Sequence, residues 1–217
     1  MREKHRIFRD RVHAGAVLAE MLQAFKDNHS LILGIPAGGV PIASVVADRL
    51  GLDFDLAVVS KITLPWDTEA GYGAVAFDGT TRLNDRLTNR LRLEEGTIRE
   101  GIRKTKQKVH RRNVELRGKV PFPKLVDRTL IVVDDGLASG FTMLVAVEAL
   151  AKNGADDIFV AVPTGQFRSI ETLSSRVSGI FCPNIRSGMV FAVADAYEHW
   201  SDVSEKEVSA LFTPDRS

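Results

Sequence analysis

Cysteine and long hydrophobic runs are what this sequence most lacks. Cys182 is the one cysteine in 217 residues, so the chain forms no internal disulfide and builds no zinc site from thiolates. No apolar run approaches the roughly 20 residues that a helix needs to span a bilayer. The first residues, MREKHRIFRDRVHAG, carry charges without a following apolar stretch, which argues against a secretory signal. We therefore expect a cytoplasmic protein that does not enter a membrane.

Net charge is lacking as well, because 29 lysines and arginines are balanced by 28 aspartates and glutamates. This balance argues against nucleic acid as a partner. The charge is uneven along the chain, however, since residues 99–119 hold nine basic side chains and two glutamates. Such a segment is usually a solvated helix face, and the alternative is a surface that meets an anionic ligand.

Short apolar runs alternate with helical patterns over most of the chain. Buried strands are predicted at 31–35, 56–60, 129–133, 158–162 and 179–182, and helices at 12–22, 40–50, 142–152 and 169–177. This alternation indicates an α/β fold with a doubly wound, mostly parallel sheet and helices on both faces. Such a fold binds its ligands at the carboxyl ends of the strands.

The middle of the chain is expected to add a small hood or flap to a single domain that spans residues 1–217. Residues 63–83 are rich in turn formers and are predicted to be a flap loop with short strands near 74–77 and 81–83. Its part around Trp66–Tyr72 is expected to close over the site. Residues 84–120 are predicted to be a helical insertion, with a long helix from Glu94 to Leu116.

The stretch most informative about chemistry is LIVVDDGLASGFT, residues 130–142. A buried strand ends in two carboxylates, Asp134 and Asp135, and small residues then lead into a helix. Free amides at a helix start bind phosphate, and the hydroxyls of Ser139 and Thr142 add donors. Carboxylates beside a phosphate cradle fit a sugar phosphate, because its vicinal hydroxyls donate hydrogen bonds to them.

This stretch resembles the phosphoribosyl diphosphate (PRPP) binding motif of type I phosphoribosyltransferases. IPAGGVPIA falls where that family has its diphosphate loop, and AVVSKI, GAVAFDG and AYEHWSDVS are similar to one uncharacterised bacterial and archaeal subgroup. The resemblance covers roughly residues 31–208. It implies transfer of 5-phosphoribosyl from PRPP to a nitrogenous base or similar acceptor with release of diphosphate. Mg²⁺ would be held mainly through substrate oxygens and water, with no direct protein ligand.

The resemblance also implies a role for individual residues. Asp134 and Asp135 would hold the ribose hydroxyls, and Lys61 would add positive charge near the diphosphate. The backbone donors of the diphosphate loop would be Ala37, Gly38 and Gly39. The loop around the 5′-phosphate would be Gly136, Leu137, Ala138, Ser139, Gly140, Phe141 and Thr142.

Two residues depart from the family's pattern. Ala37 stands where many members of the subgroup have arginine, which leaves Lys61 or an arginine of residues 99–119 as the replacement. Ala138 stands where hypoxanthine-guanine enzymes carry an aspartate, which counts against a 6-oxopurine substrate.

Several interpretations remain open at this point. A PRPP- or nucleotide-binding regulator with little catalysis is the main alternative, and a phosphatase with an aspartate nucleophile is a third. Tyr197 and Trp200 form a weak candidate for a base pocket, because such aromatics more often pack in the core or anchor a tail. Lys61 is equally well explained as a solvated lysine. The sequence leaves open which base is the acceptor and whether the protein forms a homodimer.

Overall fold

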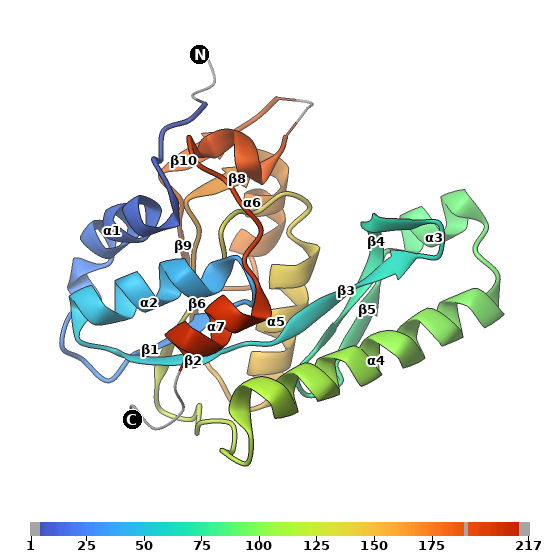
Figure 1. Ribbon diagram of the computed structural model, residues 1–217, viewed down its shortest axis with the longest axis horizontal. Coiled ribbons are helices and arrows are strands. Elements are labelled where there is room, and N and C mark those ends of the chain that lie inside the picture. Colours follow the sequence, from blue (N-terminus) through green and yellow to red (C-terminus); the bar gives the residue numbers. More distant parts are fainter. Residues whose placement is uncertain (1–4, 189–190, 213–217) are drawn as a thin grey trace.

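Figure 1 shows a computed structural model, which describes residues 5–188 and 191–212. Its centre is a five-stranded sheet in the order β2-β1-β6-β7-β9, with all neighbouring strands parallel. The strands are β1 (Leu31–Gly34), β2 (Asp53–Leu56), β6 (Thr129–Val133), β7 (Asp157–Ala161) and β9 (Gly179–Phe181). The predicted α/β fold with a mostly parallel sheet is confirmed. Within the described ranges, no helix is long and apolar enough to cross a membrane.

Helices cover both faces of this sheet because alternate strand residues point to opposite sides. Ile32 and Ile131 pack with α1 (Arg11–Met21) and α2 (Gly39–Leu50). Leu33 and Val132 pack with α5 (Phe141–Lys152) and α6 (Phe167–Ser174) on the other face. The helix boundaries follow local signals: the Asp10 carboxylate accepts a hydrogen bond from the His13 amide, and α2 ends at the left-handed Gly51.

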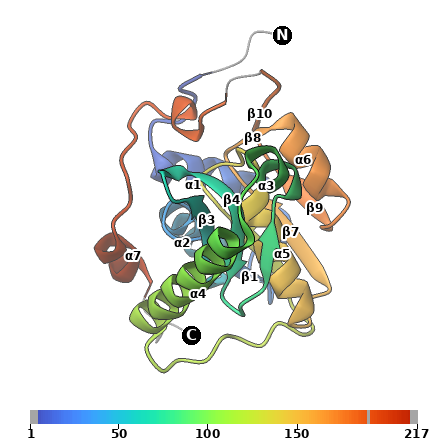
Figure 2. The same ribbon diagram turned by 90° about the vertical axis from the view of Figure 1, so that its right-hand side faces the viewer.

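A second sheet forms the hood, which projects to one side of the parallel sheet (Figures 1 and 2). It is antiparallel, in the order β3-β4-β5, and carries two helices. Its elements are β3 (Val59–Leu64), β4 (Asp67–Ala76), β5 (Thr81–Leu83), α3 (Asp85–Leu91) and α4 (Glu95–Arg117). Ala74 and Ala76 face α5, whereas Ile62 and Tyr72 face α4. The hood sheet therefore lies between these two helices.

Two predictions for this region were wrong. The apolar run 56–60 is not one strand, because Leu56 ends β2 and Val59 begins β3 in the other sheet. The predicted flap loop is instead a β3–β4 hairpin, in which Leu64 pairs with Asp67. Gly71 and Gly73 lie within β4 rather than in a loop. Tyr72 is fully buried, whereas Trp66 at the tip of the hairpin keeps 67% of its surface exposed.

The rest of the chain supports the carboxyl edge of the parallel sheet. A small parallel pair, not predicted from the sequence, follows β7 and β9, and the tail then runs over α2 to a last short helix (Figure 1). These elements are β8 (Thr164–Gln166), β10 (Asn184–Arg186), η2 (Val193–Ala196) and α7 (Glu205–Leu211), whereas η1 (Gln23–Phe25) follows α1. The tail is anchored at Tyr197, which bridges to Phe8, and at Val208, which is buried.

Candidate functional site

The two loops singled out in the sequence meet at one edge of the parallel sheet. β1 and β6 are neighbouring parallel strands, so their carboxyl ends lie side by side. The amide of Ile35, just after β1, donates to the carbonyl of Val133 at 2.9 Å. The cis peptide bond Pro36–Ala37 and the start of α2 follow on one side, and Asp134 and Asp135 follow on the other.

The loops approach each other so closely that only glycine fits at the contact. A Cβ atom on Gly38 would lie 1.9 Å from Oδ2 of Asp135. A Cβ atom on Gly39 would lie 2.5 Å from the carbonyl oxygen of Val133. The sequence predicted these glycines as room for a diphosphate. In the structure they let the Gly38 loop pack against the acidic pair.

The turn between the acidic pair and α5 forms a cradle of backbone donors. Gly140 adopts φ +69° immediately before the helix, a conformation that favours glycine. No partner within the described chain binds the amides of Ala138, Ser139 and Gly140. The hydroxyl of Ser139 accepts a weak hydrogen bond from the Phe141 amide at 3.4 Å. Free amides at the start of a 12-residue helix provide the partial positive charge that a phosphate needs.

Leu137 is the member of this loop that faces inward. Its side chain is buried in the core, and its amide donates to the Thr164 carbonyl at 2.8 Å. The Gln166 amide donates back to the Leu137 carbonyl at 2.9 Å. The structure therefore places Leu137 as an anchor that fixes the loop on β8, with no group free for a ligand.

The acidic pair is held in an environment that opposes its ionisation. Burial raises the pKa of Asp134 well above the usual carboxyl range, and the neighbouring charge of Asp135 raises it further. Burial also raises the pKa of Asp135, although the cation of Arg11 opposes this effect. Oδ1 of Asp134 accepts a hydrogen bond from the Asp135 amide at 2.9 Å.

Arg11 was not recognised as a site residue in the sequence. Its Nε and Nη2 donate to Oδ2 of Asp135 at 3.2 Å and 2.9 Å, and its Nη1 donates to the Ser201 carbonyl at 2.8 Å. The guanidinium carbon also lies 4.0 Å from the ring centre of Trp200. The contact with Asp135 joins residues 124 positions apart. No local pattern around Arg11 could have revealed it.

Tyr197 and Trp200 pack on each other with ring centres 5.1 Å apart, both near the Arg11 guanidinium, and they differ in exposure. Tyr197 is buried, and its hydroxyl donates to the backbone carbonyl of Asp135 at 2.6 Å. Burial raises the pKa of that hydroxyl, so it stays a donor. Trp200 keeps 38% of its surface exposed and stacks on Arg11. Tyr197 thus contacts Asp135 itself, and Trp200 contacts the arginine that binds Asp135. Trp200 also lines a hollow of about 550 Å³.

The two candidate replacements for the missing arginine at position 37 also come near the site. Lys61 lies within β3 of the hood, not at the end of a strand of the parallel sheet, and its charge lowers the pKa of both aspartates. Arg112 of α4 donates from Nη1 to the Pro36 carbonyl at 3.2 Å. Its Nε lies 2.7 Å from the Glu205 carboxylate, and 12% of its side chain is exposed.

The hood faces the phosphate loop across a second hollow of about 490 Å³. Ser139, Gly140 and Phe141 line one side, and Asn84 and Arg86 line the other. The loop therefore has open space between itself and the hood.

Comparison with known proteins connects this site to a family. A family model described as the phosphoribosyl transferase domain matches residues 79–198. Two curated proteins of Mycobacterium tuberculosis, from strains CDC 1551 and H37Rv, carry the provisional name phosphoribosyl transferase. Each is 32% identical to this chain over 207 residues, which are 95% of this chain and 46% of the relative. The chain thus spans about half the length of these curated relatives.

Solved structures share the fold. The TT1426 protein from Thermus thermophilus matches with a TM-score of 0.74 and 29% identity, over 94% of this chain and 96% of that protein. The AQ2163 protein from Aquifex aeolicus matches with a TM-score of 0.50 and 12% identity, over 86% of this chain and 78% of that protein. The first match includes the hood as well as the parallel sheet, because it covers nearly all of both chains.

Proposed function

Because this chain belongs to the type I phosphoribosyltransferase family, we propose that it transfers 5-phosphoribosyl from PRPP to a nitrogenous base or similar acceptor. One observation supports this above all: Asp134 and Asp135 lie beside a cradle of free amides, and both adjoin the Gly38 loop. A ribose 5-phosphate has hydroxyls for the carboxylates and a phosphate for the amides. The diphosphate on its C1′ would then extend toward the Gly38 loop.

The proposed reaction exchanges one bond at C1′ of the ribose. The C1′–O bond to diphosphate breaks with its electron pair leaving on the diphosphate oxygen. A nitrogen lone pair of the acceptor forms the C1′–N bond, and a proton is released from that nitrogen. Because the old bond breaks early, positive charge develops on the ribose ring. Asp134 and Asp135 would stabilise this charge, and fixing both phosphate ends would align C1′ with the acceptor.

Mg²⁺ is proposed as the cofactor of this reaction, bound mainly through diphosphate and ribose oxygens and water. The described residues contain no group of three or more His, Cys, Asp or Glu side chains that could hold a metal ion. A hard cation such as Mg²⁺ can be held by substrate oxygens and water. When bound, the ion would neutralise charge on the departing diphosphate. The backbone of the Gly38 loop and Lys61 would orient the same group.

The experiment that tests this function follows diphosphate release from PRPP in the presence of Mg²⁺ and a panel of bases. Release with at least one base is expected. The variants Asp134→Asn and Asp135→Asn should bind PRPP more weakly in calorimetry, because each loses charge where the hydroxyls donate. Unchanged affinity in both variants would remove the ribose assignment. Release of phosphate in place of diphosphate would favour the phosphatase.

The phosphate cradle can be tested separately with Gly140→Val. A branched side chain is strained at φ +69°, and its Cβ atom would lie 3.2 Å from Cβ of Ser169. Ribose 5-phosphate should raise the unfolding temperature of the wild type but not of this variant, since ligand binding stabilises the native state. Equal protection of both proteins would place the 5′-phosphate elsewhere.

A second candidate function is a regulator that binds PRPP or a nucleotide with little catalysis. Ala37 favours it, because this position offers no side chain to the leaving diphosphate. The same panel separates the two functions. Tight PRPP binding without diphosphate release for any base would support the regulator and contradict the transferase.

A further inference from the structure

Arg11 is more firmly fixed than any other cation that the structure places next to the acidic pair. Three of its donors are used, two on Asp135 and one on the Ser201 carbonyl. Trp200 covers the guanidinium, and 11% of the Arg11 side chain is exposed. Neither the family motif nor the local sequence assigns this residue a role, yet it directly contacts the carboxylate proposed to hold ribose.

The two carboxylate oxygens of Asp135 differ in their contacts with Arg11. Both guanidinium donors bind Oδ2, the oxygen packed against Gly38. Neither guanidinium donor binds Oδ1. A carboxylate held in this way offers one oxygen, in a fixed orientation, to a further donor.

The backbone of Asp135 is held by a residue of the C-terminal tail that also contains Trp200 and Ser201. The Tyr197 hydroxyl donates to its carbonyl at 2.6 Å, while Ser201 and Trp200 hold Arg11. The tail segment 197–201 and helix α1 therefore fix Asp135 at its main chain and at its side chain. Stability alone gives little reason for this arrangement, because a buried ion pair often stabilises a fold no more than an apolar pair does.

We propose that Arg11 is a positioning residue: it fixes Oδ2 of Asp135 so that Oδ1 accepts a hydrogen bond from a ribose hydroxyl of PRPP. This inference rests on the proposed function. It assigns a role to the start of α1 and to Trp200, both of which lie outside the two substrate loops. Arg11 acts through Asp135 and needs no contact with the substrate.

Electrostatics give the positioning a measurable signature. The charged and titratable groups that face Asp135 are Asp134, Arg11, Lys61 and the Tyr197 hydroxyl. Without Arg11, two buried carboxylates would stand side by side with Lys61 as the remaining nearby cation. One of them would then hold a proton at a higher pH, and a protonated carboxyl offers a donor where the ribose hydroxyl needs an acceptor.

The test compares Arg11→Gln and Arg11→Lys with the wild type. Arg9→Gln is the matched control, because Arg9 pairs with Asp10 at the surface and 64% of its side chain is exposed. Calorimetry measures PRPP affinity as a function of pH, and NMR of carboxyl carbons measures the pKa of Asp135. Arg11→Gln should raise that pKa and shift the acid limit of PRPP binding to higher pH. At neutral pH, binding should weaken about tenfold, in the range of one lost charge-assisted hydrogen bond.

Arg11→Lys should fall between the wild type and Arg11→Gln, because it keeps the charge but loses the two-donor contact with Oδ2. Arg9→Gln should change neither quantity. If Arg11→Gln does not fold, Trp200→Leu provides the second test, since it keeps the arginine but removes the ring over it. A smaller shift in the same direction is then expected.

An unchanged Asp135 pKa and an unchanged pH profile in folded Arg11 variants would overturn the proposal, whatever happens to their unfolding temperature. Failure of the wild type to bind PRPP at all would instead overturn the proposed function. The pKa measurement distinguishes the two failures, because it needs no substrate.

Discussion

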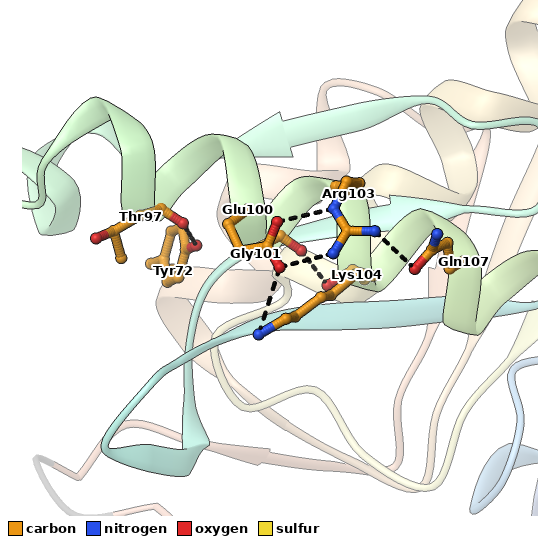
Figure 3. A network of polar contacts seen from close by, with 8 residues as sticks. Tyr72, Thr97, Glu100, Gly101, Arg103, Lys104 and Gln107 are labelled. Carbon is orange, nitrogen blue, oxygen red and sulfur yellow. Dashed lines mark hydrogen bonds and ion pairs between the residues drawn. The ribbon is translucent and has the colours of Figure 1, made fainter.

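The two halves of helix α4 carry the same kinds of basic residues but use them differently. In the first half, Arg103 and Lys104 lie 2.7 Å and 3.5 Å from the Glu100 carboxylate, and all three side chains face solvent (Figure 3). These contacts lower the pKa of Glu100 to about 2, mainly through the hydrogen bond from Arg103. They remain on the surface of the helix and reach no other element.

In the second half, the side chains of Arg112 and Arg117 contact other elements of the fold and are nearly buried. Arg112 reaches the diphosphate loop at Pro36. Arg117, with 6% of its side chain exposed, pairs with Asp55 of β2 and donates to the Pro121 carbonyl at 2.7 Å. The comparison shows that a dense run of basic residues is not itself a site. Burial and reach distinguish the two arginines that connect the hood to the parallel sheet.

The largest effect is expected at the buried pair. Arg117→Met leaves Asp55, with 14% of its side chain exposed, without its cation. Removing one partner of a buried ion pair costs about 3 kcal/mol of unfolding free energy. Urea unfolding should show this loss, and adding Asp55→Asn should recover part of it by removing the stranded charge. Arg111→Met is the control, because Arg111 is 70% exposed on the same helix. Equal losses in both variants would abolish the distinction between buried and solvated arginines.

The next effect tests the first half of α4 on its packed side. A Cβ atom on Gly101 would lie 2.0 Å from the Tyr72 hydroxyl oxygen and 3.0 Å from Ile62. Gly101→Ala should therefore destabilise the fold by about 1–3 kcal/mol through overpacking. Gly96→Ala meets nothing within 4 Å and should be neutral or slightly stabilising. If both substitutions stabilise, α4 does not pack on β4 as tightly as the structure indicates.

The parallel-sheet half of the fold was predictable because its signals are local. The strand at 129–133 was predicted with its observed bounds, and the signals that begin α1 at Asp10 and end α2 at Gly51 are single residues. The hood was predictable only in part. The strand at 81–83 and the long helix from Glu94 to Leu116 match β5 and α4, but a β3–β4 hairpin with glycines inside a strand has the composition of a loop. The short helix at 85–91 and the pair β8–β10 are too brief for a periodic pattern.

The candidate site divides in the same way. Two short sequence motifs, each recognisable from its residue types, contain Asp134, Gly140 and the two glycines after Ala37. The structure brings these two motifs together. Arg11 and Arg112 could not be found in this manner. Each reaches the site from a helix far away in the sequence, and each stands among other arginines that remain in solvent. Only the tertiary structure shows which arginines reach the site and which of their sequence neighbours remain in solvent.

A smaller and more specific effect is expected for Arg112. Arg112→Gln keeps a donor near the Pro36 carbonyl but removes the charge beside the diphosphate loop. PRPP affinity should fall about tenfold, in the range of one lost charge-assisted hydrogen bond. Ribose 5-phosphate affinity should not change, because that ligand has no diphosphate. Calorimetry with both ligands decides the point, and equal losses for the two would mean that Arg112 only supports the fold.

The smallest effect is expected where the first half of α4 faces solvent. Arg99, Arg103 and Lys104 have side chains that are 71%, 56% and 70% exposed. Changing all three to glutamine should leave PRPP affinity, diphosphate release and thermal unfolding unchanged within error, since exposed pairs contribute little.

The same variant tests whether this surface binds a polyanion. Binding of RNA or DNA by the wild type at micromolar concentration, falling steeply with salt and lost in the triple variant, would reveal counterion release. That result would contradict our expectation that nucleic acid is no partner, and it would make the solvated half of α4 the functional one.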